Sequence, residues 1–117
     1  MAGLGGLRVE AALHRRVWGG GRLGGGEPPV GEAWLVHEGD RVAAGPGTGR
    51  TLAELTAEWG EALLGRVPWS RTGARFPLLI KLLDTADWLS VQVHPDDAAA
   101  ERLERPGHFG KTEAWHI

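Results

Sequence analysis

One stretch of the sequence, FPLLIKLLDTADWLSVQVHPDD from Phe76 to Asp97, limits the possible folds more than any other. Its first part is a continuous apolar run of strand length, interrupted only by Lys81, which is typical of a strand buried on both faces. The turn-forming segment Asp84–Asp87 then separates this run from a second extended segment. The sequence therefore predicts two strands joined by a short turn.

The second segment, WLSVQVHPDD, alternates between apolar and polar residues. Because side chains of a strand point alternately to its two faces, the polar ones share a face. These are Trp88, Ser90, Gln92 and His94. A Gln-x-His pair lies about 7 Å apart at the backbone, close enough for both side chains to bind one ion. Glu113 could supply a third ligand, but from the residues alone a solvent-facing polar side is the favoured interpretation.

The segment GHFGKTEAWHI contains Gly110-Lys111-Thr112, which looks like the end of a phosphate-binding loop. Such a loop needs a glycine five positions before the GK pair, and this chain has Arg105 there. Glu113 and Trp115 alternate as in a strand instead of opening a helix. We therefore predict a final strand that starts near Lys111, with Lys111, Glu113 and Trp115 on one face.

Two short helices are expected. The first begins at Thr51, which forms a capping box with Glu54, and Gly65 is placed to end it. Its apolar residues recur at helical spacing: Leu52, Leu55, Trp59 and Leu63. Asp96 can cap the second helix, which continues to about Leu103 before Pro106-Gly107 stops it.

The sequence of the N-terminal half predicts short strands that are separated by loops. Leu7–Leu13 and Trp34–Val36 have extended patterns, whereas VWGGGRLGGGEPPVGEAW between them breaks all periodicity and is expected to be a loop. Trp18 and Trp34 lie in or beside loops and could line a sugar-binding cleft, although core packing is the commoner role for tryptophan. The other histidines, outside the polar row, are interpreted as surface or structural: His14, His37, His108 and His116.

Composition excludes several classes of function. The chain has 117 residues, enough for one domain over 1–117. A net charge of −2, without long runs of either sign, gives no electrostatic reason to expect nucleic acid or membrane as a partner, so a small molecule is expected. Cysteine is absent, so any metal must be held by histidine, carboxylate or amide oxygen. No apolar run reaches the length of a membrane span, and we expect a cytoplasmic protein.

The motifs FPLLIKLLDTADWLSVQVHPDD and GKTEAWHI, preceded in order by VWGGGRL and GEAWLV, resemble type I mannose-6-phosphate isomerase, the phosphomannose isomerase of the cupin superfamily. The resemblance covers nearly the whole chain. It implies an isomerase of carbohydrate metabolism, which interconverts mannose 6-phosphate and fructose 6-phosphate with one zinc ion through an enediol.

The resemblance also implies roles for individual residues. Gln92, His94 and Glu113 match metal ligands of the family, and Ser90 and Lys111 match residues that face the substrate. Trp18 and Glu32 match positions near the pocket. No residue is assigned as the catalytic acid or base.

By the same resemblance, the fold is expected to be mainly β with two short helices, as a partial cupin-type jelly-roll barrel that stops before closure. The family's fourth metal ligand, a histidine, and two further cationic residues would lie beyond Ile117. Exposed sheet edges could then pair with another copy. The alternative function is a non-enzymatic metal- or sugar-phosphate-binding fragment, or a half-barrel that needs a partner chain. An iron dioxygenase of the cupin type is disfavoured because the strand offers too few histidines.

Overall fold

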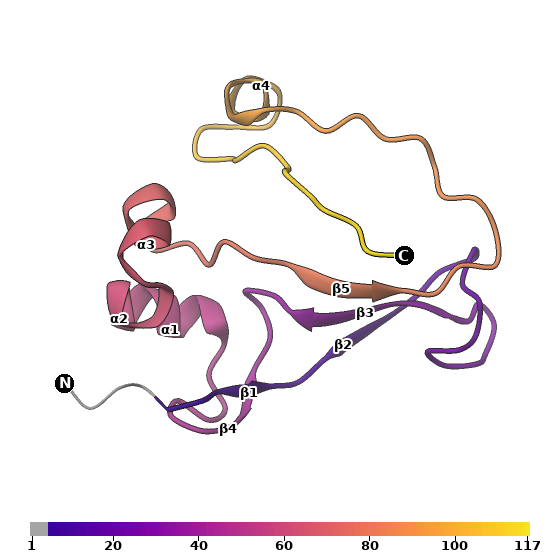
Figure 1. Cartoon of the computed structure of the whole chain (residues 1–117), viewed down its shortest axis with the longest axis horizontal. Coiled ribbons are helices and arrows are strands. Elements are labelled where there is room, and N and C mark those ends of the chain that lie inside the picture. The colour runs from indigo at the N-terminus through magenta and orange to yellow at the C-terminus, as the bar shows by residue number, and fades with distance from the viewer. Residues whose placement is uncertain (1–4) are drawn as a thin grey trace.

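The computed structural model of the chain describes residues 5–117. Its central layer is a three-stranded antiparallel sheet in the order β2-β3-β5, formed by Ala12–Arg15, Val30–Val36 and Ile80–Leu83 (Figure 1). A second, two-stranded antiparallel sheet pairs β1, Arg8–Val9, with β4, Val42–Ala44. The strand predicted over Leu7–Leu13 is thus two short strands in different sheets. The extended segment predicted at Trp34–Val36 is confirmed and starts earlier, at Val30.

Register in the central sheet places the polar residues of three strands on one face. His14 pairs with Glu32, and Glu32 pairs with Leu83 on its other side. Two residues further along β3, Trp34 pairs with Lys81. Because directly paired residues point to the same side of a sheet, these five side chains share one face. That face carries the site described below.

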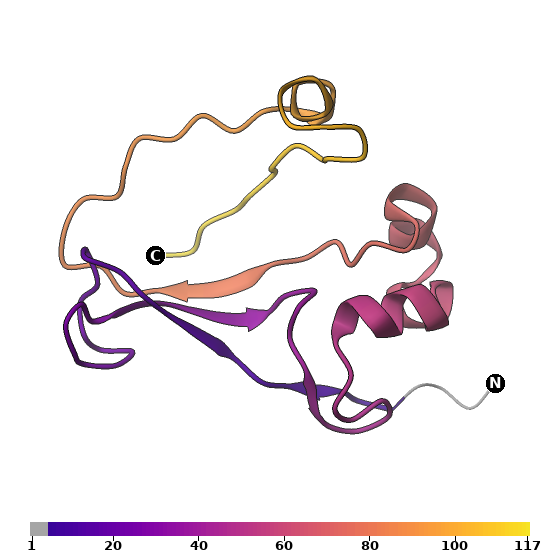
Figure 2. The ribbon, with the colours of Figure 1, turned by 180° about the vertical axis from the view of Figure 1, so that it is seen from behind.

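Four short helices occur in residues 5–117, where two were expected. The first three lie together at one end of the central sheet, as Figure 2 shows from behind. They are α1, Leu52–Trp59; α2, Glu61–Leu64; and α3, Arg66–Thr72. The predicted capping box of Thr51 and Glu54 is present at α1.

Two details of this helical region differ from the expectation. The first helix ends at Trp59 because Gly60, with φ 48°, interrupts it, and the chain restarts as α2 before Gly65, whose φ is 82°. Helix α3 was not expected, because a proline inside a segment such as that around Pro68 commonly breaks a helix. Pro68 lies in the first turn of α3, where a backbone N–H has no partner within the helix in any case.

The core is small and lies between the β1–β4 sheet and helix α1. Its buried apolar residues are Val42, Leu52 and Leu55. Partly buried apolar side chains pack against it: Leu7, Val9, Val36, Trp59, Leu63 and Phe76. The hydrophobic core therefore lies at one end of the molecule, and the central sheet extends away from it.

Strand β5 is not buried on both faces as predicted. Ile80 is 47% exposed and Leu82 is 50% exposed, because no second layer of residues 5–117 covers the outer face of β5. Residues 88–94 and 111–117 are extended without forming strands, since neither segment joins a ladder of backbone hydrogen bonds. The predicted strands there are wrong within the described chain, although the extended backbone is as expected.

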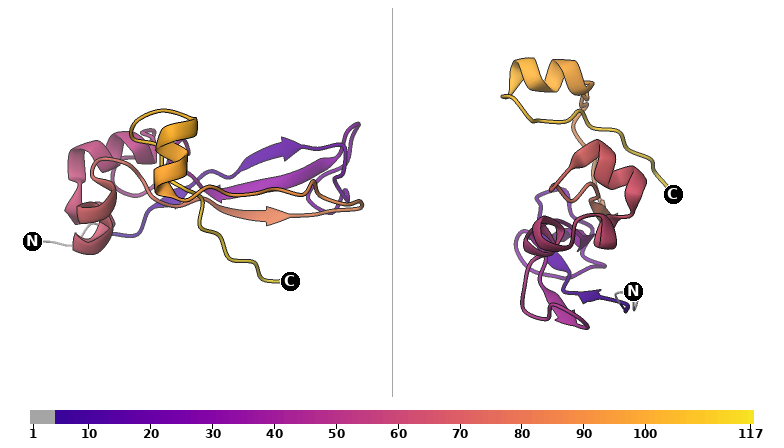
Figure 3. Two further views of the ribbon diagram at one scale, coloured as in Figure 1. Left: turned by 90° about the horizontal axis from the view of Figure 1, so that it is seen from above. Right: turned by 90° about the vertical axis from the view of Figure 1, so that its left-hand side faces the viewer.

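The last helix, α4, covers Asp97–Leu103 and is capped by the Asp96 side chain, as predicted. Figure 3 shows α4 apart from the other three helices. The chain is mainly strands with four short helices, and residues 5–117 form no closed barrel. This is the open arrangement expected of part of a cupin-type barrel. None of the helices described is long and apolar enough to cross a bilayer.

Candidate active site

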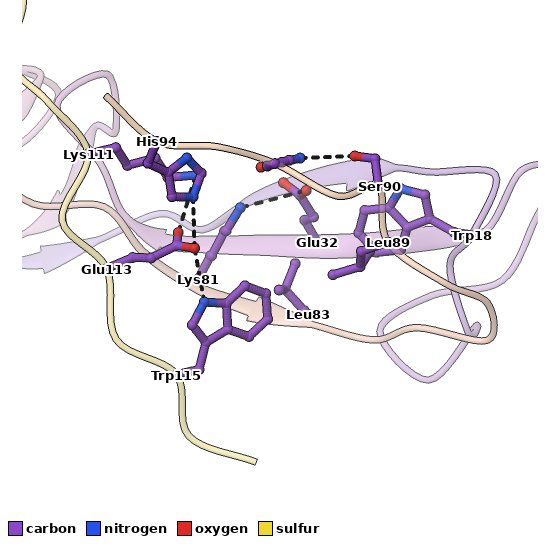
Figure 4. Close-up of a pocket in the computed structure, with 11 residues that line it drawn as sticks. Trp18, Glu32, Lys81, Leu83, Leu89, Ser90, His94, Lys111, Glu113 and Trp115 are labelled. Carbon is purple, nitrogen blue, oxygen red and sulfur yellow. Dashed lines mark hydrogen bonds and ion pairs between the residues drawn. The ribbon is translucent and has the colours of Figure 1, made fainter. Parts of the chain in front are cut away.

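A cavity of about 290 Å³ lies over the polar face of the central sheet (Figure 4). Four parts of the chain form it: the central sheet, the loop after β2, the extended segment 88–94 and the C-terminal segment 111–115. The lining residues are Trp18, Glu32, Lys81, Leu83, Leu89, Ser90, Gln92, His94, Lys111, Glu113 and Trp115. Every residue to which the resemblance assigned a role therefore borders this cavity, whereas Trp34 is not among the residues that line it.

Alternation along the segment 88–94 gives the predicted polar row, with one exception. Ser90, Gln92 and His94 line the cavity, whereas Val91 and Val93 are 99% and 93% exposed on the other side. Trp88 also points to solvent instead of joining the row. The row has its expected direction because alternation is a local property of extended backbone and does not need a ladder.

His94 and Glu113 are in direct contact in this cavity. The His94 Nε2 lies 2.9 Å from the Glu113 Oε1, and Gln92, which donates its side-chain N–H to the Ser90 hydroxyl at 3.1 Å, lines the same wall. Within the described chain, no group of three His, Cys, Asp or Glu side chains is arranged to hold a metal. The candidate donor set needs the amide oxygen of Gln92 as its third member. An imidazole nitrogen, a carboxylate and an amide oxygen are a donor set that suits zinc or a harder divalent ion.

The Glu113 carboxylate receives several donors at once. The Trp115 indole N–H donates to Oε1 at 3.0 Å, and the Lys111 ammonium lies 3.2 Å from Oε2. The hydrogen bonds from Trp115 and His94, followed by the contact with Lys111, lower the pKa of Glu113 from 4.5 to about 2. Glu113 is therefore ionised at any physiological pH, as a metal-binding carboxylate must be.

Backbone contacts bring the C-terminal segment to this position. The Lys111 N–H donates to the Pro95 carbonyl at 3.1 Å, and the Gly110 N–H donates to the Asp97 carboxylate at 2.8 Å. A Cβ on Gly110 would lie 2.5 Å from the Pro95 oxygen, so only glycine allows this approach. The glycine of the GKT triplet thus serves chain packing, consistent with the exclusion of a phosphate-binding loop.

Glu32 forms a second charged cluster at the other end of the cavity. The Trp34 indole N–H donates to Glu32 Oε2 at 2.6 Å; Arg16 lies 3.4 Å from the same oxygen, and Lys81 lies 3.8 Å from Oε1. Burial raises the pKa of Glu32, but the Trp34 hydrogen bond together with the charges of Lys81 and Arg16 outweighs it and lowers the pKa below 4.5. Glu32 is thus a buried, ionised carboxylate. Its partner Trp34 is also packed between two imidazoles, those of His14 and His37.

Comparison with known proteins identifies the family. A profile for the catalytic domain of type I phosphomannose isomerases matches residues 7–109. The chain belongs to this family. The resemblance seen in the sequence motifs is thereby confirmed.

Individual phosphomannose isomerases agree with this assignment. The mannose-6-phosphate isomerase of Streptococcus mutans is 41% identical over 121 residues, which cover 95% of this chain and 36% of the relative. The mannose-6-phosphate isomerase ManA of Bacillus subtilis is also 41% identical, with the same coverage. The crystal structure of a mannose 6-phosphate isomerase from Bacillus subtilis matches with a TM-score of 0.74 and 35% identity, over 89% of this chain and 34% of that one. The chain therefore spans about a third of the length of these relatives.

Sequence reasoning did not select Lys81, a charged residue that also lines this cavity. The side chain of Lys81 reaches the cavity between Glu32 and Glu113 in the view of Figure 4. Its signal was present, because a single lysine inside FPLLIKLLD is costly to bury without a partner. The partner is Glu32, which is distant in sequence and becomes a neighbour only through the β3–β5 register.

Proposed function

We propose that the cavity binds zinc and mannose 6-phosphate and supports the interconversion of mannose 6-phosphate and fructose 6-phosphate. The observation that carries this proposal is the contact between His94 and Glu113, in a cavity also lined by Gln92 and Lys111. Membership of the type I phosphomannose isomerase family supports the choice of reaction. The names of the relatives support the choice of substrate.

Gln92, His94 and Glu113 are the residues that would hold zinc. Their donor atoms fit the ion, since Zn²⁺ binds imidazole nitrogen and carboxylate oxygen and the pKa of Glu113 already favours the ionised form. When bound, the metal would polarise the sugar oxygens and stabilise negative charge on them.

The other lining residues would bind and orient the sugar phosphate. Lys111 offers a point charge for the phosphate or a hydroxyl, and the Ser90 hydroxyl can hydrogen bond to the sugar. Trp18 supplies an apolar wall for the sugar ring. Glu32 and Lys81 provide an ionised carboxylate and an ammonium group beside each other, at 3.8 Å. An aldose–ketose isomerisation needs one group to move a proton and a cation to stabilise the enediolate, and this end of the cavity contains both kinds.

The second candidate function is binding without turnover. Two observations favour it. The sheet of residues 5–117 is open, and the chain spans about 36% of the length of the Streptococcus mutans relative. Residues from outside the described segments could then be needed for proton transfer, while the metal and sugar-phosphate contacts would be retained.

Zinc content and isomerase turnover separate these functions. The purified chain would be loaded with zinc, and formation of fructose 6-phosphate from mannose 6-phosphate would be followed before and after chelation. Glu113→Ala removes the proposed ligand, and Glu101→Ala, an exposed residue of α4, serves as the control. Turnover that chelation and Glu113→Ala both abolish, but Glu101→Ala does not, supports the isomerase.

The binding-only function predicts a different result. Zinc and mannose 6-phosphate would bind, with losses in Glu113→Ala and Lys111→Gln, but no fructose 6-phosphate would form. If the chain binds neither zinc nor the sugar phosphate, both functions are wrong for this chain.

A further inference from the structure

Asp84 lies outside the candidate cavity but contacts several parts of its wall. It directly follows Leu83, which lines the cavity from strand β5. Its backbone N–H donates to the Gly31 carbonyl at 3.0 Å, which extends the β5–β3 pairing by one step. Its own carbonyl accepts the Gly20 N–H at 2.9 Å. The backbone of Asp84 therefore connects β3 to the glycine-rich loop.

The Asp84 side chain binds the same loop a second time. Its Oδ2 accepts the backbone N–H groups of both Arg22 and Leu23, the latter at 3.3 Å. Within residues 5–117, no Lys, Arg or His side chain is recorded in an ion pair with this carboxylate. A carboxylate that accepts the N–H groups of two consecutive loop residues fixes the path of the loop at that point.

Gly20 permits this contact. An added Cβ on Gly20 would overlap the Asp84 carboxylate, so a larger residue there would require this carboxylate to move. Gly19, one residue earlier, pairs with Thr85 in an isolated antiparallel bridge, and a Cβ there would lie 3.0 Å from the Gly31 nitrogen. The loop is thus packed tightly against both β3 and the turn after β5.

The loop residue that this packing places in the cavity is Trp18. Its carbonyl accepts the Ala86 N–H at 2.9 Å. Its indole lies over the backbone of β3, because a Cβ on Gly31 would be 2.9 Å from the ring atom Cζ3. Trp18 therefore has backbone on two sides, with the turn that contains Asp84 on one and Gly31 on the other.

We infer that Asp84 is a positioning residue of the active site: its carboxylate holds the loop 19–23 so that Trp18 forms the cavity wall against which the sugar phosphate is oriented. The part of this inference that concerns the sugar phosphate rests on the proposed function. The part that concerns Trp18 does not.

The first measurement addresses Trp18 without any ligand. Acrylamide quenching of tryptophan fluorescence would be compared in Asp84→Ala, Asp84→Asn and Asp87→Ala, each with and without Trp18→Phe, so that the difference reports on Trp18 alone. Asp87 is the matched control, because its carboxylate is in the same turn and, among residues 5–117, accepts only the N–H of the next residue, at 2.7 Å. Trp18 should become more accessible to acrylamide in Asp84→Ala and should remain protected in Asp87→Ala. In Asp84→Asn most of the protection of Trp18 should return, because the amide oxygen of asparagine still accepts an N–H.

A second variant guards against misfolding of Asp84→Ala. Gly31→Ala crowds the Trp18 ring from β3, where the added Cβ would lie 2.9 Å from Cζ3 and 2.8 Å from the Arg16 Cβ, and it removes no group that hydrogen bonds to Asp84. It should also increase the accessibility of Trp18, with an unchanged far-ultraviolet circular dichroism spectrum. Unchanged quenching of Trp18 in a folded Asp84→Ala protein would overturn the inference.

The second measurement is the dissociation constant for mannose 6-phosphate by calorimetry on the zinc-loaded chain. Asp84→Ala and Gly31→Ala should each weaken binding about fivefold to tenfold, the equivalent of one hydrogen bond, while zinc affinity stays unchanged. Unchanged sugar-phosphate affinity in a protein whose Trp18 has become accessible would overturn the functional part. If the unsubstituted chain does not bind mannose 6-phosphate but Trp18 responds as expected, the positioning of Trp18 is supported and the proposed function is what fails.

Discussion

The His94 Nε2 and the Glu113 Oε1 lie 2.9 Å apart although the two residues are separated by 19 positions in the chain. Between them the chain forms helix α4 and turns back at Pro106-Gly107. The Lys111 N–H donates to the Pro95 carbonyl at 3.1 Å and so holds the returning segment against the segment that precedes α4. The geometry of the proposed metal site therefore depends on how closely Gly110 approaches Pro95 and Asp96.

Gly110→Ala should weaken zinc binding without removing any ligand. The new Cβ would lie 2.5 Å from the Pro95 oxygen and 2.6 Å from the Asp96 carbonyl carbon, so the two segments must separate. Misplacing ligands commonly costs metal affinity about tenfold or more. Competition with a chromophoric zinc chelator measures the effect. Gly25→Ala is the control, because apart from its chain neighbours no atom of the described residues lies within 4 Å of the added Cβ. Equal zinc affinity in the two variants would contradict the role of Gly110.

Trp115→Phe and Trp34→Phe should act on different carboxylates. The Trp115 indole N–H is the largest cause of the low pKa of Glu113, so its removal should raise that pKa from about 2 towards 4.5. Removal of the Trp34 indole N–H should raise the pKa of Glu32 in the same way. Carboxyl ¹³C chemical shifts followed with pH in the metal-free chain measure both values. Each variant is the control for the other. If one substitution changed the pKa values of both Glu113 and Glu32, the two charged clusters would not be independent.

Local features of the fold could be predicted from the sequence, because their causes lie within a few residues. The capping box of Thr51 and Glu54, the Asp96 cap of α4 and the direction of the row Ser90, Gln92 and His94 all follow from neighbouring residues or from alternation.

Features that depend on distant parts of the chain could not be predicted in this way. An apolar run such as FPLLIKLLD indicates a buried strand, but burial requires a second layer, and residues 5–117 do not supply one for Ile80 and Leu82. The role of Lys81 was hidden in the same run, because its partner Glu32 is on another strand. Helix α3 was missed because a proline in a first turn and a proline that breaks a helix look alike in sequence.

The capping box at Thr51 should give the stability of the chain a specific pH dependence. Hydrogen bonds from the backbone and side chain of Thr51 lower the pKa of Glu54 below its ordinary 4.5. A carboxylate with a lowered folded-state pKa stabilises the fold above the unfolded-state value, and this stabilisation is lost as the pH falls through the folded-state value. The difference in Tm between the chain and Glu54→Gln should therefore be present at pH 7 and should shrink as the pH falls below about 4. Glu101→Gln is the control for removal of one carboxylate. If the difference in Tm between the chain and Glu54→Gln were as large at pH 3 as at pH 7, the ionised Glu54 carboxylate would not be what stabilises the capping box.

Leu55→Ala should destabilise the chain far more than Leu82→Ala. Leu55 has no exposed surface and packs in the small core with Val42 and Leu52, so its truncation leaves a cavity and should cost about 3 kcal/mol of unfolding free energy. Leu82 is 50% exposed on β5, so its truncation should cost less than about 1 kcal/mol. Urea unfolding followed by circular dichroism measures both. Equal losses would mean that the outer face of β5 is covered in solution, and a dependence of the Leu82→Ala loss on protein concentration would identify a second copy as the cover.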